Sequence, residues 1–166
     1  IQLFGSGHVI KGNYIVSSAD GIVAYDGIAN SIIEHNVVDL KTGRYGIELY
    51  SDNGSTIRYN TLVYGTGCEY VPCGQIILSR KTSDPAGTGT IVENNIATAI
   101  STENGSTAAV NRNNMLRSGA SGQNTNGTPV FVGGASPANF AGFLLASGSP
   151  GKGAATDGSD VGIHAQ

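Results

Sequence analysis

The chain of 166 residues contains no tryptophan, one methionine and two cysteines, and only 13% of its residues are charged. The net charge of −3 excludes a strongly basic surface, so we expect no binding to nucleic acid. No run of about 18 apolar residues occurs, and the sequence therefore predicts no membrane-spanning helix. It also lacks a basic start followed by an apolar stretch, which is the pattern of a signal peptide.

Glycine is abundant, at 25 of 166 residues, and asparagine, serine and threonine are frequent. These residues favour tight turns and disfavour helices. A hydrophobic fraction of 39% is ordinary for a folded chain of this length. We therefore expect a single β-rich domain that turns often.

The two cysteines lie close together in the segment Cys68-Glu-Tyr-Val-Pro-Cys73. A local disulfide between them is the favoured interpretation, and it would require an oxidising compartment. Two free thiols are the alternative. A zinc site is not expected, because two thiolates need two further ligands and no histidine lies nearby in the sequence.

A short pattern recurs five times: a β-branched residue, an asparagine three positions later, and an apolar residue two positions after that. The asparagines are 23, 24, 34 and 19 residues apart, a spacing typical of stacked coils. Three segments between the copies, at 21–25, 46–50 and 75–79, alternate with the period of a half-buried strand. Short strands that return to one face must lie parallel, so the sequence predicts a parallel β-helix of about five coils.

We interpret the repeated asparagines as structural. Asparagine tolerates the left-handed backbone of a corner, and its amide can donate to one coil while accepting from the other. The predicted ladder consists of Asn13, Asn36, Asn60, Asn94 and Asn113. The predicted inward aliphatic column consists of Ile10, Ile33, Ile57, Ile91 and Val110. In the last copy Asn111 could occupy the corner instead, but Asn113 is preferred because it keeps Met115 inward.

The repeat stops after Leu116, which predicts coils over residues 1–116 and a linker and C-terminal cap over residues 117–166. The apolar residues of the cap need a surface, which the open end or the flank of the coils can supply. The first coil has no comparable protection. We expect upstream coils or a partner chain to cover this edge, and the chain to be part of a larger protein.

The asparagine copies and the tail segments 140–150 and 160–162 resemble the right-handed parallel β-helix proteins of the pectin-lyase-like superfamily, in their C-terminal part. The resemblance implies a secreted or surface protein, bacterial in origin, that binds polysaccharide or acts on it as a lyase or hydrolase. The sequence lacks the Trp-x-Asp-His and Arg-x-Pro-x-x-Arg segments of pectate lyases and the Asn-Thr-Asp, Asp-Asp and Gly-His-Gly segments of polygalacturonases. No catalytic residue is carried over, and a non-catalytic structural or assembly module is the alternative.

If a site exists, the outward face of the Gly-Ile strands is the expected place. Alignment of these strands puts Glu48 in one outward column and Tyr25 and Tyr50 in another. The two rings could hold the face of a sugar, or they could form an aromatic ladder that stabilises adjacent strands.

Further candidates follow the same strands. Asp26 and Asp52 are expected about 6 Å apart, as a carboxylate pair or a calcium site with loop carbonyls. A lyase also needs a cation for the uronate carboxylate, and the candidates are Arg80, Lys81, Lys41 and Arg44. The remaining polar columns are interpreted as structural: ion pairs join Glu34 to Lys11 and Arg58 and join Glu93 to Arg112, and His35 stacks on Tyr59.

Overall fold

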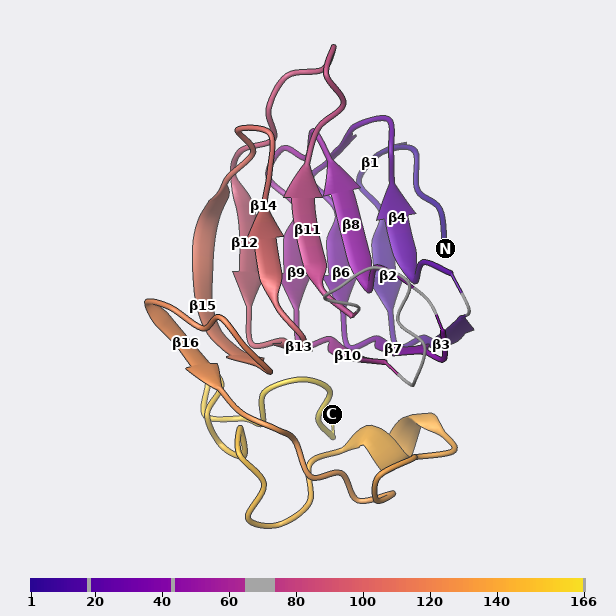
Figure 1. The fold of residues 1–166 in the computed structure, drawn as a ribbon, viewed down its shortest axis with the longest axis vertical. Helices are drawn as coiled ribbons and strands as arrows, with labels where there is room; N and C mark the ends of the chain where they lie inside the picture. Colours follow the sequence, from indigo (N-terminus) through magenta and orange to yellow (C-terminus); the bar gives the residue numbers. More distant parts are fainter. Residues whose placement is uncertain (18, 43, 65–73, 166) are drawn as a thin grey trace.

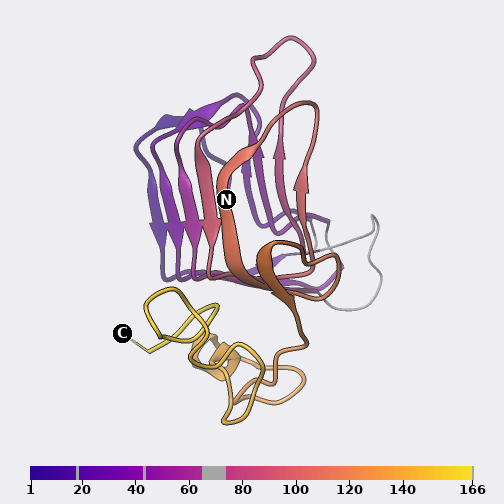
Figure 2. The same cartoon turned by 90° about the vertical axis from the view of Figure 1, so that its left-hand side faces the viewer.

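A computed structural model describes residues 1–17, 19–42, 44–64 and 74–165. The chain winds into a parallel β-helix, with its coils stacked side by side in Figures 1 and 2. The predicted all-β, solenoid fold is confirmed. Cys68 and Cys73, and with them the predicted disulfide, lie outside the described residues.

The coils have three walls, here called sheets 1, 2 and 3, of which sheets 1 and 2 are joined through β15 into one ten-stranded sheet. Sheet 1 consists of β2 (Val9–Lys11), β6 (Ile32–Glu34), β9 (Thr56–Arg58), β12 (Thr90–Glu93) and the start of β15 (Ala108–Leu116). Sheet 2 consists of β3 (Tyr14–Ser17), β7 (Val37–Leu40), β10 (Thr61–Tyr64), β13 (Ile96–Ala97) and the end of β15. Sheet 3 consists of β4 (Ile22–Ala24), β8 (Ile47–Tyr50), β11 (Ile76–Ser79) and β14 (Ile100–Thr102). The short β1 (Gly5–Ser6) pairs with β5 (Ile28–Ala29).

The core runs through the middle of the coils as columns of aliphatic side chains. In sheet 1, Ile10, Ile33 and Ile57 lie in register, as predicted. The next member of the column is Val92, which pairs with Ile57 and is fully buried, and not Ile91. Val110 is likewise not the inward residue of the following coil, because it pairs with Ile91. The prediction for the fourth and fifth coils was therefore wrong by one residue.

The predicted asparagine ladder is present, but its fourth and fifth members also differ from the prediction by one residue. It has six members, Asn13, Asn36, Asn60, Asn95, Asn114 and Asn124, each joined to the next by an Nδ2–H···Oδ1 bond of 2.9–3.0 Å. The four middle amides are fully buried, and each also donates to a backbone carbonyl of the preceding coil. Asn94 and Asn113 are not members.

The residue before each of the first five ladder asparagines has the left-handed backbone conformation. Its φ lies between +51° and +68° at Gly12, His35, Tyr59, Asn94 and Asn113. Asn94 and Asn113 thus occur where asparagine tolerates positive φ, as we argued, but this position is distinct from the ladder. Pairs of consecutive asparagines, Asn94-Asn95 and Asn113-Asn114, supply both requirements in the fourth and fifth turns.

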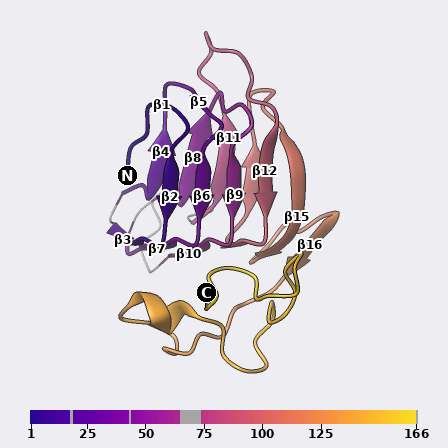
Figure 3. The ribbon, with the colours of Figure 1, turned by 180° about the vertical axis from the view of Figure 1, so that it is seen from behind.

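The segment predicted as a linker contains one more strand, β16 (Gln123–Asn126), which pairs with β15 and brings Asn124 to the end of the ladder. Residues 127–165, here called the tail, include the 3₁₀ helix η1 (Phe140–Phe143). Figures 1 and 3 show the tail along the flank of the coils. Its apolar side chains Phe143 and Ile163 pack with Val37 on the outer face of sheet 2.

Hydrogen bonds hold the tail against the left-handed residues that precede the ladder asparagines. Tyr59 donates to the Asp157 carboxylate at 2.9 Å, and Asn94 exchanges bonds of 2.8 and 3.0 Å with Thr156. Asn113 donates to a tail carbonyl at 3.2 Å. The left-handed residues therefore present their side chains outward, where they position the tail.

Candidate tyrosine–carboxylate site on sheet 3

The outer face of sheet 3 brings together the residues that the strand alignment placed in one column. Val23, Glu48 and Ile77 lie in register on β4, β8 and β11. Tyr25 and Tyr50 follow on the same face, with ring centroids 5.5 Å apart and a tilt of 59°. Because adjacent coils repeat this geometry, the face presents two aromatic rings beside one carboxyl group.

Glu48 is the central group of this face. It is 3% exposed, and its Oε2 atom has no hydrogen-bond partner in the part of the chain that the structure describes. Burial raises the pKa of Glu48, although the hydroxyls of Tyr25 and Tyr50 partly stabilise its charged form. Burial and the same carboxylate raise the pKa of Tyr50 to about 12. The site therefore holds a carboxyl group that retains its proton more readily than an exposed glutamate.

Asp20 adds a second carboxyl group. Its Oδ2 atom accepts from the Tyr25 hydroxyl at 3.1 Å and lies 3.4 Å from Arg44 Nη2. Its Oδ1 atom is buried and has no partner among the described residues. Tyr45 belongs to the same environment, because burial and the Glu48 carboxylate raise its pKa. We call Asp20, Tyr25, Arg44, Tyr45, Glu48 and Tyr50 the tyrosine–carboxylate cluster.

Sequence reasoning did not place Asp20 and Tyr45 in this site. The signal that could have found them is their position in the repeat, since each directly precedes the glycine that begins a strand segment, Gly21 or Gly46. The two segments are neighbours, because the Gly21 N–H donates to the Tyr45 carbonyl at 2.9 Å. Aligning the residue before each glycine would have added both side chains to the face.

The structure gives Asp26 and Asp52, which were predicted to form a pair, different partners. Asp52 is 1% exposed, and its carboxylate accepts hydrogen bonds from Ser55 N, Ser55 Oγ and Thr90 Oγ1 at 2.5–3.2 Å. Asp26 is exposed and forms an ion pair with Lys81. The Asp52 carboxylate thus stabilises the turn that it begins, and the Asp26 carboxylate contacts Lys81. No group of three or more His, Cys, Asp or Glu side chains among the described residues could hold a metal ion.

The cations proposed for uronate binding also have partners. Arg80 donates to the carbonyls of Asn104 and Asp84 at 2.7 and 2.8 Å, and it thereby holds a loop. Lys41 pairs with Asp39 at 2.5 Å, and Arg44 pairs with Asp20 at 3.4 Å. The interpretation of the remaining charged columns is confirmed: Glu34 contacts Lys11 and Arg58, Glu93 contacts Arg112, and His35 stacks on Tyr59 at 5.0 Å.

Comparison with known proteins adds the family. The sequence model of the family described as right-handed beta helix region matches residues 1–143. Together with the parallel sheets and the ladder, this match shows that the chain belongs to the right-handed β-helix family. No curated protein and no solved structure matches the chain. Within the described residues, no helix has the length and apolar character needed to cross a membrane.

Proposed function

We propose that this β-helix module acts outside the cell or at the cell surface and binds polysaccharide across the outer face of sheet 3. The observation that carries the proposal is the pair of partly exposed Tyr25 and Tyr50 rings, 5.5 Å apart, beside the buried carboxyl group of Glu48. Sugar recognition needs aromatic faces for the C–H side of the ring and polar atoms for the hydroxyls. The tyrosine–carboxylate cluster offers both.

The charges of this face favour a neutral polysaccharide over a polyuronate. Asp20 and Glu48 are carboxyl groups with free acceptor atoms, and Arg44 is already beside Asp20. A uronate would place further negative charge there, with no unpaired cation in the cluster to neutralise it. A neutral glycan, in contrast, adds no charge beside these carboxyl groups. We therefore favour hydrolase-like over lyase-like chemistry if the module is an enzyme.

Glu48 is the proton donor in that case. A general acid must keep its proton near neutral pH, and the raised pKa of Glu48 suits this role. It would protonate the glycosidic oxygen while water adds to the anomeric carbon, and Asp20 would accept the proton that the water loses. Both carboxyl groups would then be returned to their starting states by proton exchange with solvent.

The test is a carbohydrate array of neutral and acidic polysaccharides, followed by titration calorimetry and two activity assays. Reducing ends report hydrolysis, and absorbance of an unsaturated product reports lyase activity. We expect neutral glycans to bind, and Glu48→Gln and Tyr50→Ala to weaken binding at least tenfold. Glu93→Gln on sheet 1 is the matched control. The absence of any glycan binding, or equal binding by all variants, would refute the proposal.

A specific observation supports assembly as a second function. The first coil exposes Phe4, Val9 and Val16 by 57%, 67% and 53%. β2 and β3 each have one strand neighbour, so the other edge of each strand is open in the described structure. Another β-helical coil could pair there.

Val132 on the tail provides a matched control for this second function, because it is 65% exposed. We expect the wild-type chain to self-associate in light scattering and Val9→Lys to abolish this association. Val132→Lys should leave it unchanged. A monomer at every concentration would exclude self-assembly through this edge.

A further inference from the structure

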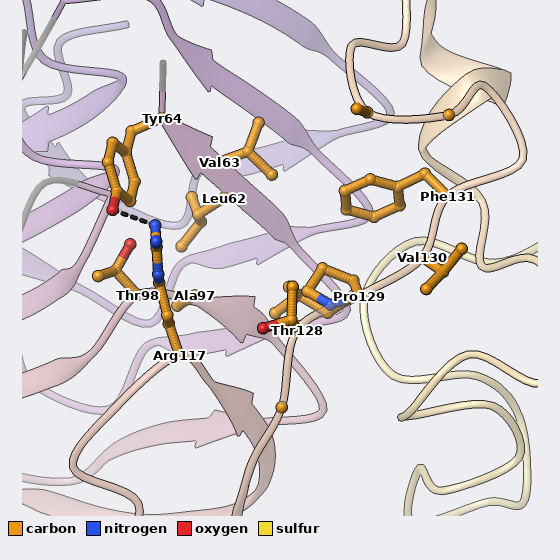
Figure 4. A pocket seen from close by; sticks show the side chains of 14 residues that line it. Leu62, Val63, Tyr64, Ala97, Thr98, Arg117, Thr128, Pro129, Val130 and Phe131 are labelled. Carbon is orange, nitrogen blue, oxygen red and sulfur yellow. Dashed lines mark hydrogen bonds between the residues drawn. The ribbon is translucent and has the colours of Figure 1, made fainter. Parts of the chain in front are cut away.

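A hollow lies between sheet 2 and the tail, on a different sheet from the tyrosine–carboxylate cluster. Its volume is about 510 Å³, which is within the range of small-molecule sites. In Figure 4, Leu62 and Val63 of β10 lie on one side and Pro129 and Phe131 of the tail on the other. The hollow is therefore a cleft whose second wall exists only because the tail docks on the coils.

The walls of this cleft are mainly apolar. Val63, Ile96 and Ala97 contribute from the strands, and Pro129 and Phe131 contribute from the tail. The polar atoms gather at one end, where Arg117 donates to the Tyr64 hydroxyl and Thr98 lies nearby in Figure 4. The Arg117 guanidinium also lies 5.1 Å from the centroid of the Tyr64 ring. The cleft thus has an apolar body and a cationic end.

Arg117 differs from the other cationic side chains of the protein. Of the nine lysines and arginines, seven contact a carboxylate and Arg80 contacts two backbone carbonyls. Arg117 has neither kind of partner among the described residues, only the neutral Tyr64 hydroxyl and ring. Among the described residues it is therefore the cation that has no carboxylate or carbonyl partner, and it lines the cleft.

We propose that the cleft binds a small amphipathic organic acid. The carboxylate would accept from Arg117, in the charge-assisted geometry that guanidinium groups favour, with the Tyr64 hydroxyl beside it. The apolar part would lie between Val63 and Phe131, where its burial removes hydrocarbon surface from water. The ligand would contact both the coils and the tail, so binding would also stabilise the docked tail.

Other ligand classes fit the cleft less well. A sugar needs hydrogen-bond partners around its ring, and the middle of this cleft offers mostly carbon atoms. An amine would be repelled by Arg117. An uncharged alcohol or lipid would contact the apolar walls but would give the Arg117 guanidinium no anionic partner. The acid uses both parts of the cleft.

The test uses the full chain and three probes of equal length: octanoate, octanol and octylamine. Calorimetry measures affinity, and amide chemical shifts of the labelled protein locate the site. We expect octanoate to bind at least fivefold more tightly than octanol and octylamine, with shifts at Val63, Ala97 and Phe131. Arg117→Gln should weaken octanoate binding about tenfold. Arg112→Gln, which removes an exposed arginine outside the cleft, should change it less than twofold.

Two results would overturn the proposal. The first is equal affinity for octanoate and octanol, or no octanoate binding at millimolar concentration. The second is binding whose shifts lie outside the cleft or whose affinity is unchanged by Arg117→Gln. Phe131→Ala provides an independent variant: it should weaken octanoate and octanol alike, because it removes part of the apolar wall and leaves the cation.

Discussion

His164 of the tail packs edge-on against His35 of the ladder turn, with ring centroids 4.6 Å apart and an interplanar angle of 76°. His35 in turn stacks on Tyr59, and His164 contacts the edge of the same tyrosine ring at 4.8 Å. The Nδ1 atoms of both histidines are buried and lack partners among the described residues. The tail is therefore held, in part, by aromatic contacts between the rings of His164, His35 and Tyr59.

This arrangement predicts an acid-sensitive tail. Burial lowers the pKa of His35 to about 4; the neighbouring His164, Lys11 and Arg58 act in the same direction, and Glu34 opposes them. The folded chain then binds fewer protons at His35 than the unfolded chain, whose histidine pKa is about 6.5. The free energy of unfolding should therefore fall as the pH decreases from about 6.5 to 4, by up to about 3 kcal/mol from this group.

Urea unfolding at pH 7 and pH 4.5 measures this loss. His35→Asn is the informative variant, because Asn94 and Asn113 already occupy the equivalent left-handed position. It should unfold with a smaller pH dependence than the wild type. His8→Asn, a change in a histidine outside this contact, should retain the wild-type dependence. An identical pH dependence for His35→Asn would contradict the assignment of the acid sensitivity to His35.

The corrected register of the ladder predicts different costs for two neighbouring asparagines. Asn95→Ala removes a fully buried amide that joins three coils, and it should cost about 3 kcal/mol because its partners stay buried and unpaired. Asn94→Gly keeps the positive φ and removes the contacts to Thr156 alone, so it should cost about 1 kcal/mol. Denaturant unfolding compares the two variants. A larger cost for Asn94→Gly than for Asn95→Ala would contradict the assignment of Asn95, and not Asn94, to the ladder.

These residues also show what the sequence could predict. Asn13, Asn36 and Asn60 were identified correctly because each repeat there contains one asparagine. In the fourth and fifth turns, consecutive asparagines fit the pattern equally well. The choice depends on whether Ile91 or Val92 faces inward, and strand alternation alone does not determine that parity. Packing against Ile57 decides it, and this contact lies 35 residues away in the sequence.

The candidate site shows the same limit. Tyr25, Glu48 and Tyr50 were placed on one face because they lie within or directly beside regular strands. Asp52 was misplaced, because the alternation was continued beyond the end of β8 at Tyr50. Ser51 has a φ of +50°, and this left-handed residue turns the chain so that Asp52 points inward. Local periodicity therefore predicts side-chain direction only as far as the strand extends.

Because the Glu48 carboxyl group is buried, its removal should stabilise the folded protein by an amount that depends on pH. Because burial raises its pKa, the folded chain binds more protons at this group than the unfolded chain does. Its contribution to stability is therefore lost as the pH rises from the unfolded value, about 4.3, through the raised folded value. Glu48→Gln should be more stable than the wild type at pH 8, and this difference should shrink toward pH 4. Glu93→Gln serves as the control in thermal unfolding, and a difference independent of pH would argue against a buried carboxyl group.

Packing of the tail predicts a large effect of one phenylalanine. Phe143 is 2% exposed and lies 5.7 Å from the Tyr14 ring and 5.4 Å from the Phe131 ring, measured between centroids. Phe143→Ala should cost about 3–4 kcal/mol and release the tail from sheet 2. Limited proteolysis should then cut residues 127–165 while the coils stay protected. Val132→Ala, at an exposed tail position, should leave the cleavage pattern unchanged.

The most direct test of the proposed function is to map a bound glycan on the labelled protein. The probe is the neutral oligosaccharide that binds best on the array, titrated while amide chemical shifts are recorded. We predict that the shifts cluster at Asp20, Tyr25, Tyr45, Glu48 and Tyr50, and that Glu48→Gln weakens the titration. Shifts that lie on sheet 1 or the tail, or a stronger response to polygalacturonate than to any neutral glycan, would contradict the proposal.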